Sequence, residues 1–132
     1  MSYFILRSLP TGFKFDLKAT NGQVIATSEV YETKAACRKG IDSVIKSAAA
    51  AKLEDRTEPD CTPCTNPRFE LYTDRSGAFR FRLRARNGKI IAISEGYSSK
   101  AACKNGIASV RKNAPEAQIA DPSLDLFQKE QG

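Results

Sequence analysis

An internal repeat is the feature that most constrains what this chain can fold into. Residues 3–55 align with residues 69–121 without a gap, and 23 of the 53 aligned pairs are identical. The stretch between the two copies is rich in Pro and Thr, which is typical of a linker. We therefore expect four parts, namely a first repeat over residues 1–56, a linker over 57–67, a second repeat over 68–121 and an acidic tail over 122–132.

Each repeat has the pattern of three strands, a helix and a closing strand. Residues 13–20 and 79–86 alternate apolar and polar side chains, as the residues of a half-buried strand do. The Asn-Gly pairs at 21–22 and 87–88 predict two-residue hairpin turns of type I′. The other expected elements are first strands at 3–6 and 69–72, third strands at 23–30 and 89–96, helices from Thr33 or Ser98/Ser99 to about Ser47 or Asn113, and closing strands at 51–55 and 117–121.

Each helix carries an apolar stripe at i, i+3 and i+4 spacing that predicts packing against a sheet. Gly40 and Gly106 lie within these stripes, although a glycine inside a helix costs about 1 kcal/mol relative to alanine. We therefore expect crowding of the backbone at both glycines, either against the sheet or between the two helices. Cys37 and Cys103 occupy matching stripe positions and are expected to be small core residues.

One repeat of this size is marginally stable alone, because so small a core rarely supplies more than about 3–5 kcal/mol. We therefore expect the two repeats to share one core and to form a single compact domain. The chain would be a monomer that contains its own dimer, with an approximate two-fold axis between the repeats. The expected fold class is α+β.

Three segments carry a resemblance to a known family. They are Phe69-Glu-Leu-Tyr72, the strand and turn from Phe79 to Gly88, and the stretch from Ser94 to Val110. In these segments the chain resembles the YegP-like family of small bacterial proteins. The resemblance implies tandem β(3)-α-β units that form one antiparallel sheet, with both helices on one face and exchanged C-terminal strands. It brings no established function and no catalytic residues, and this chain departs from the family pattern in its long Cys-containing linker and at Val30, where the second repeat has Gly96.

The chain contains no His, which removes the commonest general base and the commonest neutral metal ligand. Ser-His-Asp and Cys-His catalysis are excluded, as are the usual Cys2His2 zinc sites. Tyr31 with Lys34, and Tyr97 with Lys100, could transfer protons, but packing of a tyrosine at a strand end is the more common arrangement. We expect no catalytic residues, no metal and no cofactor, and interpret the protein as a non-enzymatic binding or interaction module of unknown role.

The longest apolar runs are far shorter than the ~20 residues that a helix needs to cross a bilayer. The N-terminal residues do not resemble a signal peptide. These features predict a cytoplasmic protein without a membrane partner.

A ladder of four arginines is the sharpest local motif. Strand alternation puts all four on one sheet face, and a two-residue turn predicts that they lie opposite partners on the next strand, as the pairs Arg80–Glu95, Arg82–Ile93, Arg84–Ile91 and Arg86–Lys89. In the first repeat, Lys14 would pair with Glu29 in the same way. In one interpretation, arginine stems cover Ile91 and Ile93 and the ladder only stabilises the sheet.

The other interpretation is an anion-binding face for nucleic-acid phosphates or another polyanion. Residues 68–114 carry eleven basic and three acidic residues, which concentrates the positive charge of the chain. Among the aromatic residues, only Tyr72 is expected to join the arginine face, so contacts to a phosphate backbone are favoured over base stacking. The candidate residues are Lys14, Lys18, Arg80, Arg82, Arg84, Arg86 and Lys89.

Cys61 and Cys64 form a CxxC motif in the linker. Without a strand-to-helix setting, the motif does not match a thioredoxin site. We expect a local thiol pair that can form a disulfide or stay reduced, so a redox-responsive role is the second alternative function. A zinc site would need Cys37 and Cys103 as further ligands, which their expected burial disfavours.

The first strand is expected to turn Tyr3 and Ile5 to the core, and Phe4 and Leu6 to the open side. The acidic tail carries three apolar residues, Leu124, Leu126 and Phe127. We expect the tail to dock beside Phe4 and Leu6.

Overall fold

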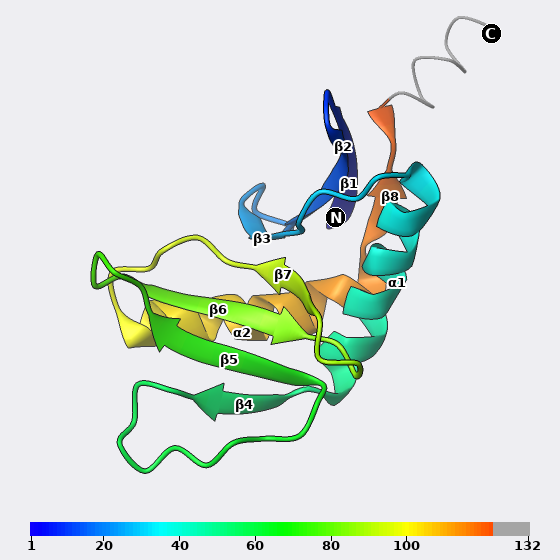
Figure 1. Cartoon of the computed structure of the whole chain (residues 1–132). Coiled ribbons are helices and arrows are strands. Elements are labelled where there is room, and N and C mark those ends of the chain that lie inside the picture. Colours follow the sequence, from blue (N-terminus) through cyan, green and yellow to red (C-terminus); the bar gives the residue numbers. More distant parts are fainter. Residues whose placement is uncertain (123–132) are drawn as a thin grey trace, which may run out of the picture.

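The computed structural model describes residues 1–122 of the chain. These residues form eight strands, two α-helices and one short 3-10 helix (Figure 1). In chain order the elements are β1 (Tyr3–Leu9), β2 (Gly12–Lys18), β3 (Val24–Thr27), α1 (Lys34–Ala50), β4 (Lys52–Asp55), β5 (Arg68–Thr73), β6 (Phe79–Arg84), β7 (Ile90–Ile93), α2 (Lys100–Asn113), η1 (Ala114–Glu116) and β8 (Gln118–Ala120).

The strands form one sheet in the order β4-β5-β6-β7-β3-β2-β1-β8. The closing strand of each repeat pairs with the first strand of the other repeat, β4 with β5 and β8 with β1. The predicted α+β fold and the exchange of C-terminal strands are therefore confirmed. The sheet is mixed and not, as the resemblance implied, antiparallel throughout, because these two edge pairings are parallel and all inner pairings are antiparallel.

Both helices pack on the same face of the sheet, and α2 runs behind β5 and β6 in Figure 1. Thr33 and Ser99 cap them, as predicted, by accepting hydrogen bonds from the backbone N–H groups of Ala36 and Ala102. The core contains the aromatic residues Phe4, Phe15, Phe69 and Phe81, which are all fully buried. Buried residues of both repeats belong to one continuous hydrophobic cluster.

Gly40 and Gly106 lie where a tyrosine crosses each helix. A Cβ atom at Gly40 would overlap the hydroxyl of Tyr31, and one at Gly106 would overlap the hydroxyl of Tyr97. The predicted crowding is thus against the residue that follows the third strand, not between the two helices. Tyr31 and Tyr97 also stack on the core phenylalanines, with ring centroids 6.3 and 6.4 Å apart.

Two equivalent ion pairs join the repeats at their exchanged strands. Lys34, in the first turn of α1, lies 2.9 Å from Asp121 after β8. Lys100, in the first turn of α2, lies 3.2 Å from Asp55 at the end of β4. A lysine in the first turn opposes the helix dipole, and these contacts between repeats explain its presence at both helices.

The hairpin turns at the Asn-Gly pairs differ from the predicted type I′. Gly22 and Gly88 have φ of 86° and 85°, but no other residue type in the described chain has a positive φ. Each loop has three residues and ends in a glycine bulge, since Ala19 N donates to Gln23 O at 2.9 Å and Gly22 N to Ala19 O at 2.9 Å. Asn21 contributes through its side chain instead, which accepts a hydrogen bond from Gln23 N.

The first strand has the opposite orientation from the one that the ungapped alignment predicts. Phe4 and Leu6 pair with Leu17 and Phe15 on the helix-facing side and are almost completely buried, so the expectation that they face the open side was wrong. The structure matches Phe4 to Phe69, an offset of 65 residues, because the turn between β5 and β6 is one residue longer. One extra residue reverses which side chains of a strand face the core.

The apolar tail residues 124, 126 and 127 lie outside the described residues. Their expected docking place beside Phe4 and Leu6 does not exist, because both side chains are in the core. Within residues 1–122, no helix has the length and apolar character needed to cross a membrane.

Candidate anion-binding face

The sheet face opposite the helices carries most of the predicted binding residues. Residues that pair across neighbouring strands share a face, so the register defines a row that crosses the whole sheet. From β4 to β8 this row contains Glu54, Glu70, Arg82, Ile93, Thr27, Asp16, Ile5 and Ala120. The half from β4 to β7 has three charged residues and one isoleucine, and the half from β3 to β8 has one charged residue, one threonine and two apolar residues.

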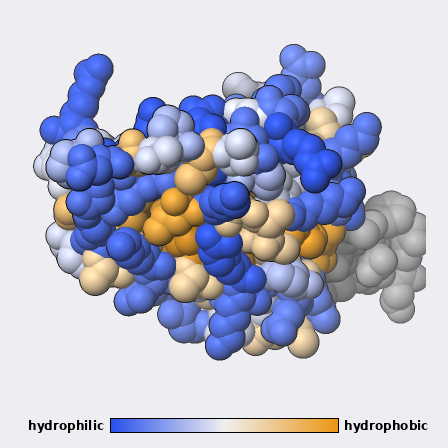
Figure 2. Space-filling view, turned by 90° about the horizontal axis from the view of Figure 1, so that it is seen from below, coloured by the Kyte–Doolittle hydropathy of each residue, from blue (hydrophilic) through white to orange (hydrophobic). Residues whose placement is uncertain are grey.

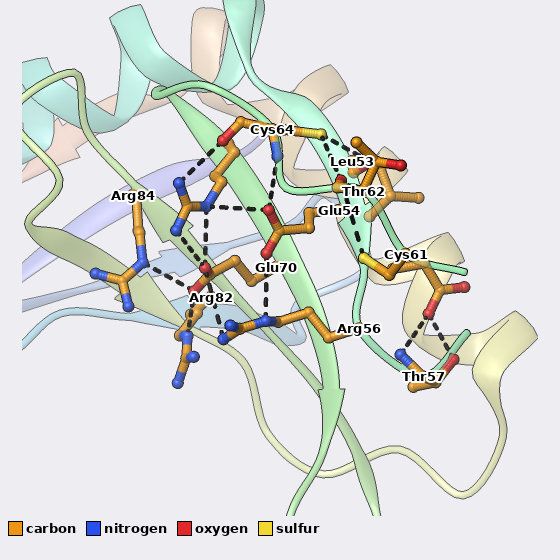
Figure 3. Close-up of polar contacts among 12 residues, drawn as sticks. Leu53, Glu54, Arg56, Thr57, Cys61, Thr62, Cys64, Glu70, Arg82 and Arg84 are labelled. Carbon is orange, nitrogen blue, oxygen red and sulfur yellow. Dashed lines mark hydrogen bonds and ion pairs between the residues drawn. The ribbon is translucent and has the colours of Figure 1, made fainter. Parts of the chain in front are cut away.

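Glu70 is the centre of the charged half, and its side chain is fully buried although it lies on the open face. Arg68 donates to Oε2 through Nε at 2.9 Å and Nη2 at 2.8 Å. Arg82 and Arg84 donate to Oε1 through their Nε atoms at 2.5 and 2.9 Å. Figure 3 shows Arg82 and Arg84 directed at the carboxylate of Glu70.

Burial alone would raise the pKa of Glu70, since it removes the carboxylate from water. The hydrogen bonds from Arg82, Arg68 and Arg84 outweigh burial and lower the pKa from 4.5 to about 2. Glu70 is therefore ionised throughout the physiological range, and it holds three guanidinium groups in fixed orientations.

Glu54 is a second buried carboxylate, directly opposite Glu70 on the neighbouring strand. It accepts a hydrogen bond from the backbone N–H of Cys64 at 2.7 Å and lies 3.2 Å from Arg56 Nε. Arg68 Nη1 in turn donates to the carbonyl of Cys64 at 3.0 Å. These contacts fasten the linker to the charged cluster (Figure 3).

Arg80 does not form the predicted ion pair with Glu95. Its Nε lies 2.7 Å from Asp74, and its Nη1 donates to the carbonyl of Ser94. Asp74 belongs to the turn after β5, where hydrogen bonds from Ser76 and Arg80 lower the pKa of its carboxyl group. In the described chain, the ion pair expected between Lys14 and Glu29 is also not formed.

The Asn-Gly loop between β6 and β7 has three residues instead of the predicted two, and this changes the pairing at the end of the arginine ladder. Arg82 pairs with Ile93, as predicted, but Arg84 pairs with Ile90 and not with Ile91. The register shift turns Ile91 into the core, where 6% of it is exposed. The expectation that Ile91 lies under the arginines was therefore wrong.

Arg86 and Lys89 do not extend the ladder, and the predicted pairing between them was wrong. Arg86 lies inside the loop, where it lines a pocket with Ser43 and Lys46 of α1, on the helix side of the sheet. The carbonyl of Lys89 instead accepts a hydrogen bond from Ala85 N at the base of the loop. Because one residue more than expected enters the loop, alternation along β6 ends at Arg84.

A groove of about 410 Å³ crosses the middle of the open face, where β3 meets β7. Arg7 and Lys14 line it from the first repeat and Arg80 from the second, together with Asp16 and Glu95. Arg7 is paired with Asp16 at 2.9 Å. Among the described residues, Lys14 has no ion-pair partner, so its ammonium group is available to a ligand.

The first repeat has an apolar hollow where the second has the charged cluster. This hollow of about 280 Å³ is lined by Met1, Tyr3, Ile5, Lys18 and Ala120, among others. Lys18 therefore lines this hollow, whereas Lys14 lines the central groove.

None of the four cysteines forms a disulfide in the structure. Cys37 and Cys103 are fully buried, which agrees with their expected place in the core. Burial raises the pKa of the Cys103 thiol to about 11. The thiols of Cys61 and Cys64 are partly exposed, and both lie near the carbonyl of Thr62.

Sequence reasoning missed the roles of Arg56, Arg68 and Glu54 on this face. The only sequence feature that points to these roles is the closing strand Lys52–Asp55. It does so only once this strand is known to pair with the first strand of the other repeat. The stacking of Arg82 over Tyr72 was anticipated only as a shared face, and the guanidinium carbon lies 4.6 Å from the ring centroid. Within residues 1–122, no group of three or more Cys, Asp or Glu side chains could hold a metal ion.

A family model described as domain of unknown function DUF1508 matches this chain twice, over residues 11–55 and 74–121. The two matches coincide with the two repeats. Neither match includes the first strand of its repeat, β1 or β5. These are the strands at which the ungapped alignment of the repeats disagrees with the structure.

Similar proteins support the same assignment and confirm the resemblance to YegP. A UPF0339 protein of Photorhabdus laumondii is 39% identical over 119 residues, which cover 90% of this chain and 91% of that protein. The solution NMR structure of YegP from E. coli, described as a protein of unknown function, has a TM-score of 0.72 at 34% identity and 91% coverage of both chains. A UPF0339 protein of Treponema denticola is 57% identical over 54 residues, which are 93% of its length, so it has the size of one repeat.

Proposed function

The chain belongs to the DUF1508 family, also named UPF0339, and from this premise we propose that it is a non-enzymatic module that binds a polyanion on its open sheet face. The ligand we propose is the phosphate backbone of a nucleic acid, bound by a monomer. The observation that carries the proposal is the central groove, which brings basic side chains from both repeats to one uncovered surface. Its Lys14 has no ion-pair partner in the described chain.

The shape of the face favours backbone contacts over base reading. The core phenylalanines point to the helices, and Tyr72 is covered by the guanidinium of Arg82. Single-strand readers instead present exposed aromatic rings for stacking. A groove lined by Arg7, Lys14 and Arg80 can contact phosphates without regard to sequence.

The structure also decides which residues make a clean test. Replacing Arg82 or Arg84 would remove partners of the buried Glu70, so lost binding could reflect lost stability. Lys14→Gln removes one unpaired charge from the groove and, within the described chain, no side-chain hydrogen bond or ion pair. Lys39→Gln is the matched control, because Lys39 is exposed on α1, on the helix side of the sheet.

The test is fluorescence anisotropy with duplex and single-stranded oligonucleotides over a range of salt concentrations. We expect binding at low salt that weakens as salt rises, with a salt slope that falls by about one unit in Lys14→Gln. Lys39→Gln should leave the slope unchanged. Absence of binding at low salt, or equal losses in the two variants, would contradict the proposal.

A further inference from the structure

The charged cluster of the second repeat carries more positive than negative charge. Two buried carboxylates, Glu54 and Glu70, lie within ion-pair distance of four arginines, Arg56, Arg68, Arg82 and Arg84. The formal charge of these six side chains is therefore +2. Neutralising the carboxylates accounts for only half of the guanidinium groups.

The arginine side chains that carry the excess charge are partly buried and fixed in orientation. The side chains of Arg68, Arg82 and Arg84 are only 21%, 22% and 25% exposed. Each is oriented by at least one hydrogen bond to Glu70, and Arg82 is also stacked on Tyr72. Such pre-orientation reduces the entropy that binding of an anion would otherwise cost.

Several donors of the cluster remain unused by the protein. Each of the three nitrogens of Arg68 already donates a hydrogen bond to Glu70 or Cys64. Arg82 donates to Glu70 through Nε only. Arg84 donates to Glu70 through Nε and to the carbonyl of Gly88 through Nη1. Within the described residues, the two terminal nitrogens of Arg82 and the Nη2 atoms of Arg84 and Arg56 therefore have no protein acceptor.

The geometry points to a subsite for a phosphate monoester dianion, formed by Arg56, Arg82 and Arg84 at the edge of the open face. Two negative charges match the excess of the cluster, and the planar donors of guanidinium groups suit phosphate oxygens in bidentate contacts. Figure 2 views the molecule from the side on which β4 lies in Figure 1 and shows hydrophilic side chains around a hydrophobic patch. The subsite rests on the proposed function, because it would receive the terminal phosphate of a bound nucleic acid.

The same chemistry could come from a free small phosphate, so the experiment has two arms. In the first, anisotropy compares single-stranded oligonucleotides of one sequence with and without a 5′-phosphate. In the second, inorganic phosphate is titrated against chloride at equal ionic strength, and NMR follows the Nε–H signals of Arg82 and Arg84. We expect the 5′-phosphate to tighten binding about tenfold, because charge-assisted hydrogen bonds contribute about 1.5–3 kcal/mol each.

Arg56→Gln is the variant that tests the subsite, because Arg56 is 47% exposed and its loss leaves Glu54 bound to Cys64 N and near Arg68. Arg38→Gln is its matched control, with 42% exposure and an ion pair to the buried Asp121. Discrimination between the oligonucleotides should fall below about threefold in Arg56→Gln and persist in Arg38→Gln, in line with the loss of one charge-assisted contact. Arg56→Lys, which keeps the charge but loses the planar donors, should have an intermediate effect.

The outcomes separate the two proposals. Phosphate-dependent shifts of the arginine signals without oligonucleotide discrimination would support the subsite and assign it to a free phosphate. If no oligonucleotide binds but phosphate still shifts these signals, the subsite stands and the proposed function fails. If oligonucleotides bind through Lys14 but neither arm detects a phosphate effect, the subsite is overturned and the proposed function stands.

Discussion

The open faces of the two repeats differ, although the backbone beneath them is the same. At four equivalent positions the second repeat has charged residues, where the first has two apolar or aromatic residues and two charged ones. The equivalent pairs are Arg68 and Tyr3, Glu70 and Ile5, Arg82 and Asp16, and Arg84 and Lys18. The result is a buried carboxylate with three arginines in one half and an apolar hollow in the other.

The helix-facing side shows the opposite behaviour, because its features occur twice. Both helices have a hydroxyl cap, a buried cysteine, and a glycine under a tyrosine, and both begin with a lysine paired to an aspartate of the other repeat. Packing and strand exchange constrain this side equally in the two repeats. The open face carries no such constraint, and its differences are the features on which the proposed binding sites rest.

The largest expected effect is on stability, from Glu70→Gln in the charged cluster. A pKa held at about 2 instead of 4.5 corresponds to about 3 kcal/mol of stability, at 1.4 kcal/mol per unit. Because the folded-state pKa is lowered, this contribution is present above pH 4.5 and is lost as the pH falls toward 2. We expect Glu70→Gln to lose most of it at pH 7 and to have a flatter acid profile, measured by urea unfolding between pH 2 and 7.

Glu95→Gln is the control for Glu70→Gln, since Glu95 is exposed at the central groove of the same sheet face. It should change the free energy of unfolding by less than about 0.5 kcal/mol. Asp55 and Asp74, whose pKa values are also lowered, should leave a residual acid slope in Glu70→Gln. An unchanged slope between pH 4.5 and 2 would show that the arginines do not hold Glu70 ionised.

A smaller effect is expected at the duplicated glycines. Alanine normally stabilises a helix interior by about 1 kcal/mol relative to glycine. Gly40→Ala and Gly106→Ala should instead each destabilise by about 1–3 kcal/mol, because the new Cβ would overlap Tyr31 or Tyr97.

Thermal unfolding of both glycine variants would also test whether the repeats form one domain. Each variant should lower a single, shared transition by a similar amount. Asn105→Ala, at an exposed position beside Gly106, should be neutral or slightly stabilising. Two separate transitions, or a shift in only one variant, would contradict the shared core.

The smallest effect concerns the cysteines, which should differ in reactivity without changing stability. At pH 8, alkylation followed by mass spectrometry should find Cys61 and Cys64 modified first. Cys37 and Cys103 should react only as the chain unfolds, because both are fully buried, which excludes the reagent and raises the pKa of their thiols. Four rapidly modified thiols would contradict the core assignment.

Much of the fold could be predicted because the repeat and the alternation along its strands are local properties. Thr33 and Ser99 as caps, the crowded glycines and the pairing of Arg82 with Ile93 all followed from them. The errors at Phe4, Ile91 and Arg86 come from two loops, the turn between β5 and β6 and the Asn-Gly loop after β6, each one residue longer than assumed. In the first case the whole strand changes faces, since side chains alternate with a period of two, whereas the register shift after Leu83 confines the second change to Ile91 and the loop.

The sequence by itself determined that this protein has two similar units, an α+β fold, a basic second half and no histidine for catalysis. The tertiary structure decided which charges meet. Strand exchange places Glu54 of the first repeat beside Glu70 and Arg68 of the second, a contact between strands of different repeats that no local pattern encodes. The arginine ladder thus became part of a cluster in which the carboxylates neutralise only half of the arginines, because burial of a carboxylate requires cationic partners that only the folded sheet brings together.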